Sequence, residues 1–183
     1  MEYEKYRSDI LIANDEIHGL KLDYNFNIND CICDFYCIPS HFNFAYYVRL
    51  YKTSDLYKAV YARTEISDIF GNIIYCYPFS ETLRAKRHSV KSGKIICGYF
   101  KPSENFIVRL SALNELFPEK DCISDSGNTV LDGVWQVIRI WKNGRPFRTV
   151  SFETMSAYDL FDVEFADIVC DINELIESEI RHN

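Results

Sequence analysis

The chain has 183 residues, of which 48% are hydrophobic, 26% charged and 15% aromatic, and this is the composition of one globular domain with a sizeable core. No apolar run is long enough to span a membrane, the first residues do not resemble a signal peptide, and seven glycines are few for a glycine-rich nucleotide-binding fold. Seven cysteines, an odd number without a secretory signal, indicate reduced thiols and a cytoplasmic protein.

The net charge of −7 is distributed unevenly along the chain. Residues 153–183 contain nine acids and one arginine, a net charge of −8, so the other residues sum to +1. A basic run without acids extends from Arg84 to Lys101. The molecule is therefore expected to have an acidic end and a smaller basic patch.

Strict alternation of apolar and polar residues predicts a half-buried strand at 20–29, and short apolar and aromatic runs between turn-forming residues predict further strands after it. The predicted strands are 20–29, 31–38, 44–51, 57–64, 73–77 and 95–100. Pro39 would end the second strand, and the turn-forming sequence KTSDL would join the third and fourth as a hairpin. Ser80 could cap a short helix through the basic run.

The following residues predict one further strand at 105–110 and an exposed loop at 118–129. A hairpin is predicted from the strands 134–141 and 146–152. Asn143 and Gly144 tolerate the positive φ that both central positions of a type I′ turn require. The register set by this turn would pair Lys142 with Arg145, Trp135 with Phe152, and Val137 with Val150.

From about Ser156 the apolar period changes to 3.6 residues, which predicts an amphipathic helix of about six or seven turns. Its apolar positions are Phe161, Phe165, Ile168, Ile172, Leu175 and Ile176. About nine short strands followed by one long helix predict a single α+β domain over residues 1–183. In it, a twisted, mainly antiparallel sheet would pack against the C-terminal helix.

The spacing of Cys31, Cys33, Cys37 and His41 raises the question of a metal site. In an extended strand, Cys31 and Cys33 are about 7 Å apart and Cys37 lies about 13 Å beyond Cys33. Four zinc ligands must converge on one point, and CICDFYC has no glycine or proline that would let the chain fold back. We interpret these cysteines as apolar residues on the buried face of a strand, and expect no metal and no other cofactor.

Known catalytic patterns are absent from the sequence, which has no GxGxxG, Walker or HExxH motif and no nucleophile elbow. His88, with Arg84 and Arg87, is the best lone candidate for phosphate chemistry, but we favour the interpretation of this segment as an exposed basic loop. The basic run has no aromatic residues between its charges from Arg84 to Lys94 to stack on bases, so we do not expect nucleic-acid binding.

The C-terminal helix carries the most informative charges. Four acids fall within about 80° of each other on a helical wheel that advances about 100° per residue, namely Glu164, Asp167, Asp171 and Glu174. Like charges at spacings of three and four residues repel one another, and no lysine or arginine of the helix lies between these acids. An ordinary solvated face accounts for the pattern, and a surface for a cationic partner is the functional interpretation.

In composition the chain resembles bacterial immunity proteins and phage-type inhibitors, although no motif supports that resemblance. We expect a non-enzymatic binding protein that recognises a basic protein partner through the acidic helix edge. Tyrosine-rich strands such as FAYYVRLY would supply anchors. A barrel-like protein that binds a small ligand is one alternative, and an enzyme whose site includes His88 or His18 is another.

Overall fold

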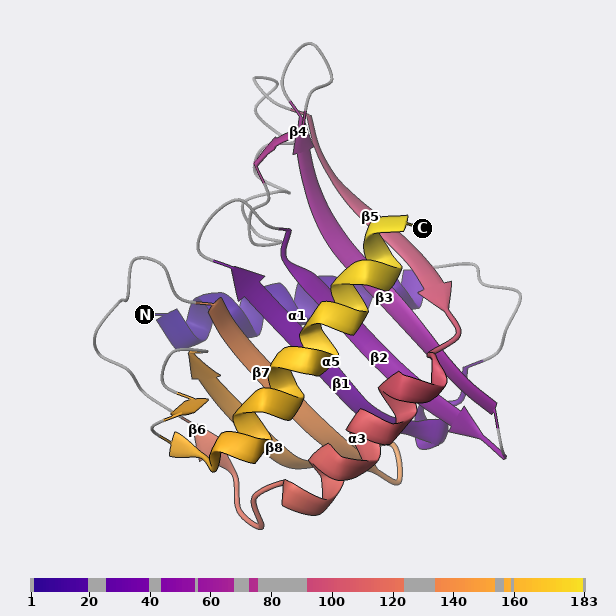
Figure 1. The fold of residues 1–183 in the computed structure, drawn as a ribbon. Coiled ribbons are helices and arrows are strands. Elements are labelled where there is room, and N and C mark those ends of the chain that lie inside the picture. Colours follow the sequence, from indigo (N-terminus) through magenta and orange to yellow (C-terminus); the bar gives the residue numbers. More distant parts are fainter. Residues whose placement is uncertain are drawn as a thin grey trace.

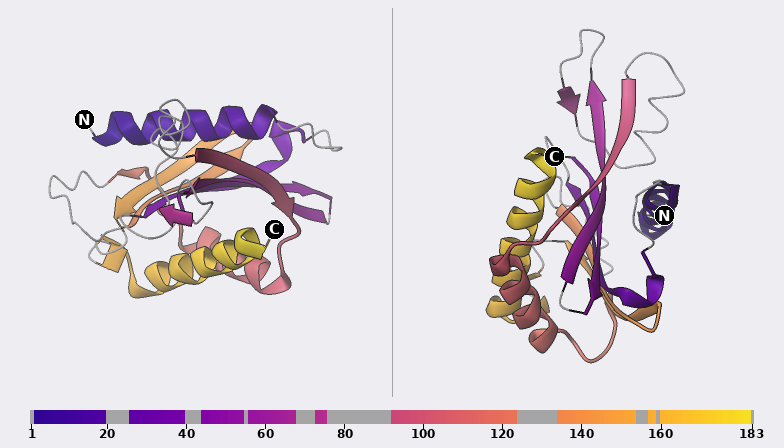
Figure 2. Two further views of the ribbon diagram at one scale, coloured as in Figure 1. Left: turned by 90° about the horizontal axis from the view of Figure 1, so that it is seen from above. Right: turned by 90° about the vertical axis from the view of Figure 1, so that its right-hand side faces the viewer.

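The computed structural model describes residues 2–19, 26–39, 44–54, 56–67, 73–75, 92–123, 134–153, 157–158 and 160–182. Within them, helices lie on both faces of one sheet, as the two views of Figure 2 show. Helix α1 (Glu2–Gly19) covers one face, and α3 (Glu104–Leu116) and α5 (Val163–His182) cover the other. The predicted α+β class is confirmed, and that the chain forms a single domain stays a prediction.

The described part of the sheet has eight strands rather than about nine (Figure 1). They are β1 (Cys31–Pro39), β2 (Tyr46–Thr53), β3 (Leu56–Ser67), β4 (Ile73–Tyr75), β5 (Ser92–Phe100), β6 (Cys122–Ile123), β7 (Val134–Lys142) and β8 (Arg145–Glu153). Their order is β4-β3-β2-β1-β7-β8-β6, with β5 also paired to β3, and only the β6–β8 pair is parallel. In this order β4 and β6 lie at the two ends, so the described strands form an open sheet. The alternative of a barrel-like protein is not supported by these residues.

Each face of the sheet has its own hydrophobic cluster. Under α3 and α5, the ring of Phe106 meets those of Phe35 and Phe100 edge-on, with centroids 6.4 and 6.5 Å apart. Under α1, the smaller cluster includes Ala13 and Ile17 of the helix. The cluster under α3 and α5 contains more buried residues than the one under α1. Because burial of each large apolar side chain contributes about 1.5–3 kcal/mol, the α3/α5 side provides most of the stability of the core.

The β7–β8 hairpin forms as predicted, with one change of register. Asn143 and Gly144 have φ of 53° and 74°, and Lys142 lies opposite Arg145. Beyond Trp141, one extra residue on β8 shifts the pairing, so that Trp135 faces Glu153, Val137 faces Ser151, and Ile138 faces Val150. The expected pairs of Trp135 and Val137 were wrong because a bulge of this kind leaves no mark in the alternation of either strand.

We predict that Gly144→Val lowers the free energy of unfolding by more than about 1 kcal/mol. A valine at this position would have to adopt positive φ, and its Cβ would lie 2.6 Å from Oδ1 of Asn29. Asn143→Gly is the matched control, because glycine accepts the same φ without strain. Urea denaturation measures both changes, and an unaltered stability of Gly144→Val would contradict the turn described here.

Two predicted strands are corrected. The first is the strand expected at 20–29, of which residues 20–25 lie outside the described residues. Its end, Ile28–Asp30, forms a 3₁₀ turn, η1, and the side chain of Asn27 caps this turn by accepting a hydrogen bond from the Asn29 amide. Residues 105–110 belong to α3 instead of a strand, because Ser103 caps a helix by accepting a hydrogen bond from the Phe106 amide. Phe106, Leu110 and Leu113 then share the buried face of that helix.

Other differences from the expected elements are smaller. Helix α1 was not predicted, and β6 lies within the expected loop 118–129. Helix α5 starts at Val163 instead of near Ser156, because a bend at Phe161 interrupts the helical pattern. Ser80 and its proposed helix lie outside the described residues. None of the described helices is long and apolar enough to cross a membrane.

Candidate functional site

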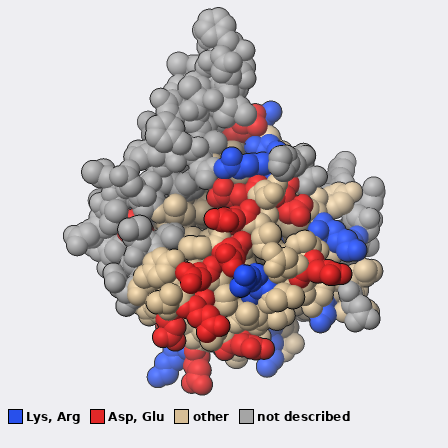
Figure 3. Space-filling view, viewed as in Figure 1, with Lys and Arg blue, Asp and Glu red and all other residues tan. Residues whose placement is uncertain are grey.

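The four predicted acids lie on the solvent side of α5. Glu164, Asp167 and Glu174 are exposed and Asp171 is half-buried, whereas Ile168, Ile172 and Ile176 of the opposite side are buried. Figure 3 shows acidic side chains along the course of α5 on this face of the molecule. Helix α5 contains six acidic residues and one arginine, and α3 beside it contains two acidic residues and one arginine.

The structure adds a partner that the sequence of α5 alone did not reveal. Nη2 of Arg109 on α3 lies 3.0 Å from Oδ2 of Asp171, and both side chains are 44% exposed. Arg181 pairs in the same way with Glu177 one turn earlier, also at 3.0 Å. The expectation that no basic residue relieves the repulsion is therefore corrected at Asp171. Both arginines of α3 and α5 are already paired within the chain.

Three exposed apolar residues lie just before or at the start of α5. Tyr158, Leu160 and Val163 are 48%, 43% and 62% exposed. The hydroxyl of Tyr158 donates a hydrogen bond of 3.1 Å to Oδ1 of Asp167, and this hydrogen bond raises the pKa of Tyr158 to about 12. An oriented aromatic ring therefore lies beside the acidic edge, in the combination typical of protein-binding surfaces.

The tyrosines of the segment 44–51 are core residues. Tyr46, Tyr47 and Tyr51 are buried, and Tyr46 donates a hydrogen bond of 2.6 Å to Oδ1 of Asn173 on α5. They are not available as contact residues in this structure. Any aromatic anchor for a partner has to come from elsewhere on the surface, so the expectation of tyrosine anchors is corrected for the segment 44–51.

The three cysteines of β1 lie on a strand, as the sequence indicated. Cys33 and Cys37 face the α5 side, but Cys31 faces the α1 side, because β1 contains one extra residue between Cys31 and Cys33. Their predicted common face is thus corrected. No group of three metal-ligating side chains occurs among the described residues. His41, like the side chains of His18 and His88, lies outside the described residues, and the expected absence of metal stays a prediction.

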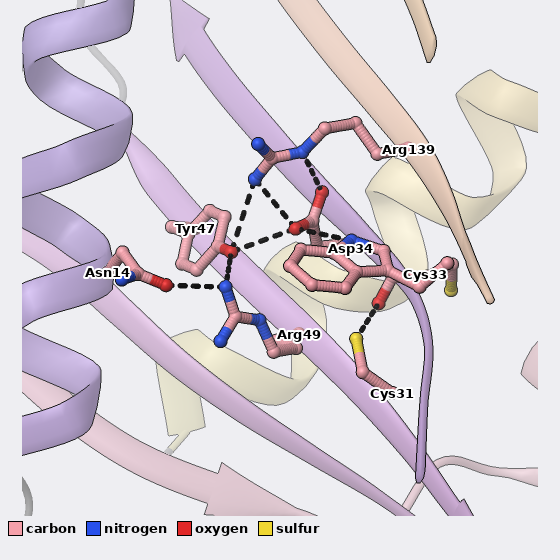
Figure 4. A network of polar contacts seen from close by, with 8 residues as sticks. Asn14, Cys31, Cys33, Asp34, Tyr47, Arg49 and Arg139 are labelled. Carbon is pink, nitrogen blue, oxygen red and sulfur yellow. Dashed lines mark hydrogen bonds and ion pairs between the residues drawn. The ribbon is translucent and has the colours of Figure 1, made fainter. Parts of the chain in front are cut away.

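A buried polar network lies between the sheet and α1 (Figure 4). At its centre, Asp34 of β1 is directly opposite Arg49 on β2 and Arg139 on β7. Arg139 donates two hydrogen bonds of 2.7 Å to the two carboxylate oxygens of Asp34, in the bidentate geometry that makes such pairs strong. Tyr47 and Trp141 donate to Oδ2 of the same carboxylate at 2.8 and 2.9 Å.

Two arginines share this single carboxylate. Arg49 donates to the hydroxyl of Tyr47 at 2.6 Å and to Asn14 of α1, and its guanidinium lies 4.8 Å from the centre of the Trp141 ring. Burial acts to lower the pKa of Arg139, but the charge and hydrogen bonds of Asp34 outweigh burial and raise this pKa. Both arginines therefore stay charged, and the network carries one excess positive charge.

The sequence also contains a signal for this network. The predicted strands 31–38 and 134–141, and the segment 44–51 between them, each hold one charged residue near the middle of an apolar run. A charge in such a place needs a partner. The pairing of β1 with β7 joins residues about a hundred positions apart, and alternation within one strand says nothing of that pairing.

A cavity of about 460 Å³ opens beside the network, between α1 and strands β6, β7 and β8. Arg139 lines the cavity at the side of the network, and Arg7 of α1 also lines it. Most of the remaining wall is apolar, with the hydroxyls of Thr149 and Ser151 on the sheet.

Comparisons of the chain with models of protein families, with curated proteins and with solved structures found no match.

Proposed function

We propose that the protein is a non-enzymatic binding protein that recognises a basic protein partner through the outer face of α3 and α5. The observation that carries this proposal is the charge of the two helices. They hold eight acidic residues and two arginines, and each arginine is paired within the chain. Such a surface attracts a basic patch and increases the rate of association.

The exposed apolar residues beside the acids are the candidates for the part of the binding affinity that charge alone does not supply. Charged groups at the edge of an interface mainly set the association rate, whereas buried aromatic and apolar anchors supply most of the affinity. Tyr158 and Val163 are suited to this role, because they flank Asp167 and Glu164. We therefore place the anchor of the interface at the start of α5, with the acids extending from it along the helix. An inhibitor or immunity protein has this type of function.

A nucleic-acid partner is disfavoured by the same charge, because phosphate groups are repelled by an acidic face. The part of the basic run from 84 to 91 lies outside the described residues.

The first test of the proposal is capture of a partner from the native host. The bait proteins are the wild type and the variant Glu164→Gln/Asp167→Asn/Asp171→Asn/Glu174→Gln. We expect a basic protein to be retained by the wild type and to be strongly reduced with the variant. The variant should fold normally, because the few tenths of a kcal/mol gained for each repulsion removed offset the small cost of losing the exposed Arg109–Asp171 pair. Equal retention of the same protein by both baits would contradict the role of the acids.

We also propose a cytoplasmic location. Six of the seven cysteines are described, and all six are free. We expect titration of the denatured protein, purified without reductant, to find seven thiols. A smaller number would reveal disulfides and indicate an oxidising compartment.

A further inference from the structure

We infer that the cavity between α1 and strands β6, β7 and β8 is a binding site for a small carboxylic acid with an apolar, preferably aromatic, body. The site lies on the opposite face of the sheet from α3 and α5, so the inference does not depend on the proposed function. Its volume of about 460 Å³ is within the range of small-molecule sites, which is roughly 300–1,000 Å³.

The charge of the wall indicates an anion. Among the residues whose side chains the structure describes, Arg7 and Arg139 are the charged ones that line the cavity, and no described acidic residue lines it. Asp9 and Glu153 are buried nearby, but neither reaches the cavity wall, and each has interactions of its own. Asp34 balances only one of the two arginines in the adjoining network, so the positive charge beside the cavity is only partly compensated.

The geometry of Arg139 fits it to hold a carboxylate. Its contacts with Asp34 and Tyr47 use Nε and Nη2, which leaves Nη1 for a further acceptor (Figure 4). Its side chain is 18% exposed, while that of Asp34 is 1% exposed. The bidentate pair thus fixes the guanidinium before any ligand binds, which reduces the ordering cost of binding. Arg7, from the helix side, can approach the same anionic group.

The rest of the wall indicates the body of the ligand. Trp135 and Val137 lie on the floor of the cavity and Ile10 and Leu11 on the helix above it, so most of the ligand would contact apolar side chains. Thr149 and Ser151 offer hydroxyls for at most a few polar groups. A sugar or a polyphosphate would leave many of its polar groups without partners, whereas an aromatic acid would not.

Calorimetric titration with three probes that share a naphthalene body tests the inference: 1-naphthoate, 1-naphthamide and 1-naphthylmethylammonium. We expect 1-naphthoate to bind with a stoichiometry of one and about tenfold or more tightly than the amide, because charged hydrogen bonds are the stronger ones. The ammonium probe should bind most weakly. Absence of binding of 1-naphthoate at millimolar concentration, or equal affinities for acid and amide, would overturn the inference.

Three variants locate the site. Arg7→Gln should weaken 1-naphthoate several-fold and leave the amide unchanged, and Thr149→Phe, which fills part of the cavity, should weaken both. Arg145→Gln removes an equal charge from an exposed position of β8 that does not line the cavity, and should change neither. Circular dichroism establishes that each variant is folded. An affinity for 1-naphthoate that is unaltered in folded Arg7→Gln and Thr149→Phe would place the binding elsewhere and overturn the assignment.

Discussion

Replacement of Asp34 by asparagine is expected to lower the free energy of unfolding by about 3–5 kcal/mol, which is the usual effect of removing one partner of a buried ion pair. The carboxylate is fully buried and accepts four hydrogen bonds, from Arg139, Tyr47 and Trp141. An amide in its place leaves the buried Arg49 and the half-buried Arg139 without a counter-charge and directs an N–H group at other donors. Since domains are stable by only about 5–15 kcal/mol, the loss is large.

The chain offers a matched control for this variant. Asp171 also pairs with an arginine, at 3.0 Å against 2.7 Å for Asp34, but the side chains of both Asp171 and Arg109 are 44% exposed. Asp171→Asn should therefore cost less than about 1 kcal/mol. Urea denaturation at pH 7 measures both variants. Similar small losses for the two would mean that Asp34 is not a buried centre of charge, and would remove the basis for a fixed Arg139.

The second large effect is expected at alkaline pH. Burial raises the pKa of Cys31 and Cys33 well above the ordinary value of 9.0 and that of Cys37 to about 12. Between pH 9 and 11, these thiols keep their protons in the native state and lose them in the unfolded state. The unfolded state then binds fewer protons, so stability falls as pH rises. Each such group contributes up to about 1.4 kcal/mol per pH unit, and the three together up to about 4 kcal/mol per unit.

Two variants separate the thiols from other causes of alkaline unfolding. Cys33→Ala/Cys37→Ala removes two of the titrating groups and should flatten the decrease in unfolding free energy between pH 8 and 10. Ile138→Val removes a methyl group from the same cluster without removing a proton, so it should lower stability equally at both pH values. A wild type that is equally stable at pH 8 and 10, or a double variant with the full decrease, would contradict the burial of these thiols.

The sequence predicted those elements whose signals are local. Short apolar and aromatic runs next to turn-forming residues located β1, β2, β3 and β7, and Asn143 with Gly144 located a turn, because both signals depend only on neighbouring residues. The C-terminal helix was recognised from a 3.6-residue period sustained over several turns. Helix α3 was missed although Ser103 and Phe106 carry a cap signal, because a short apolar run is compatible with both helix and strand.

Features that depend on distant pairing could not be predicted. The extra residues in β1 and β8 become evident only against the partner strand, and they turned Cys31 to the other face and shifted the partners of Trp135. The meeting of Asp34 with Arg139 and the pairing of Arg109 with Asp171 require the order of the strands and the approach of two helices. The four acids of α5 were found from the sequence because one helix places them all.

The central claim is that the acids of α5 guide a basic partner. Its most direct test is the association rate with the captured partner at low and high salt. Glu164→Gln/Glu174→Gln removes two exposed acids from this face, and Asp15→Asn/Glu16→Gln removes the same charge from α1 on the other face. We predict that only the first pair slows association several-fold at low salt, that the difference disappears at high salt, and that dissociation changes little. Equal association rates for both pairs at low salt would contradict the claim.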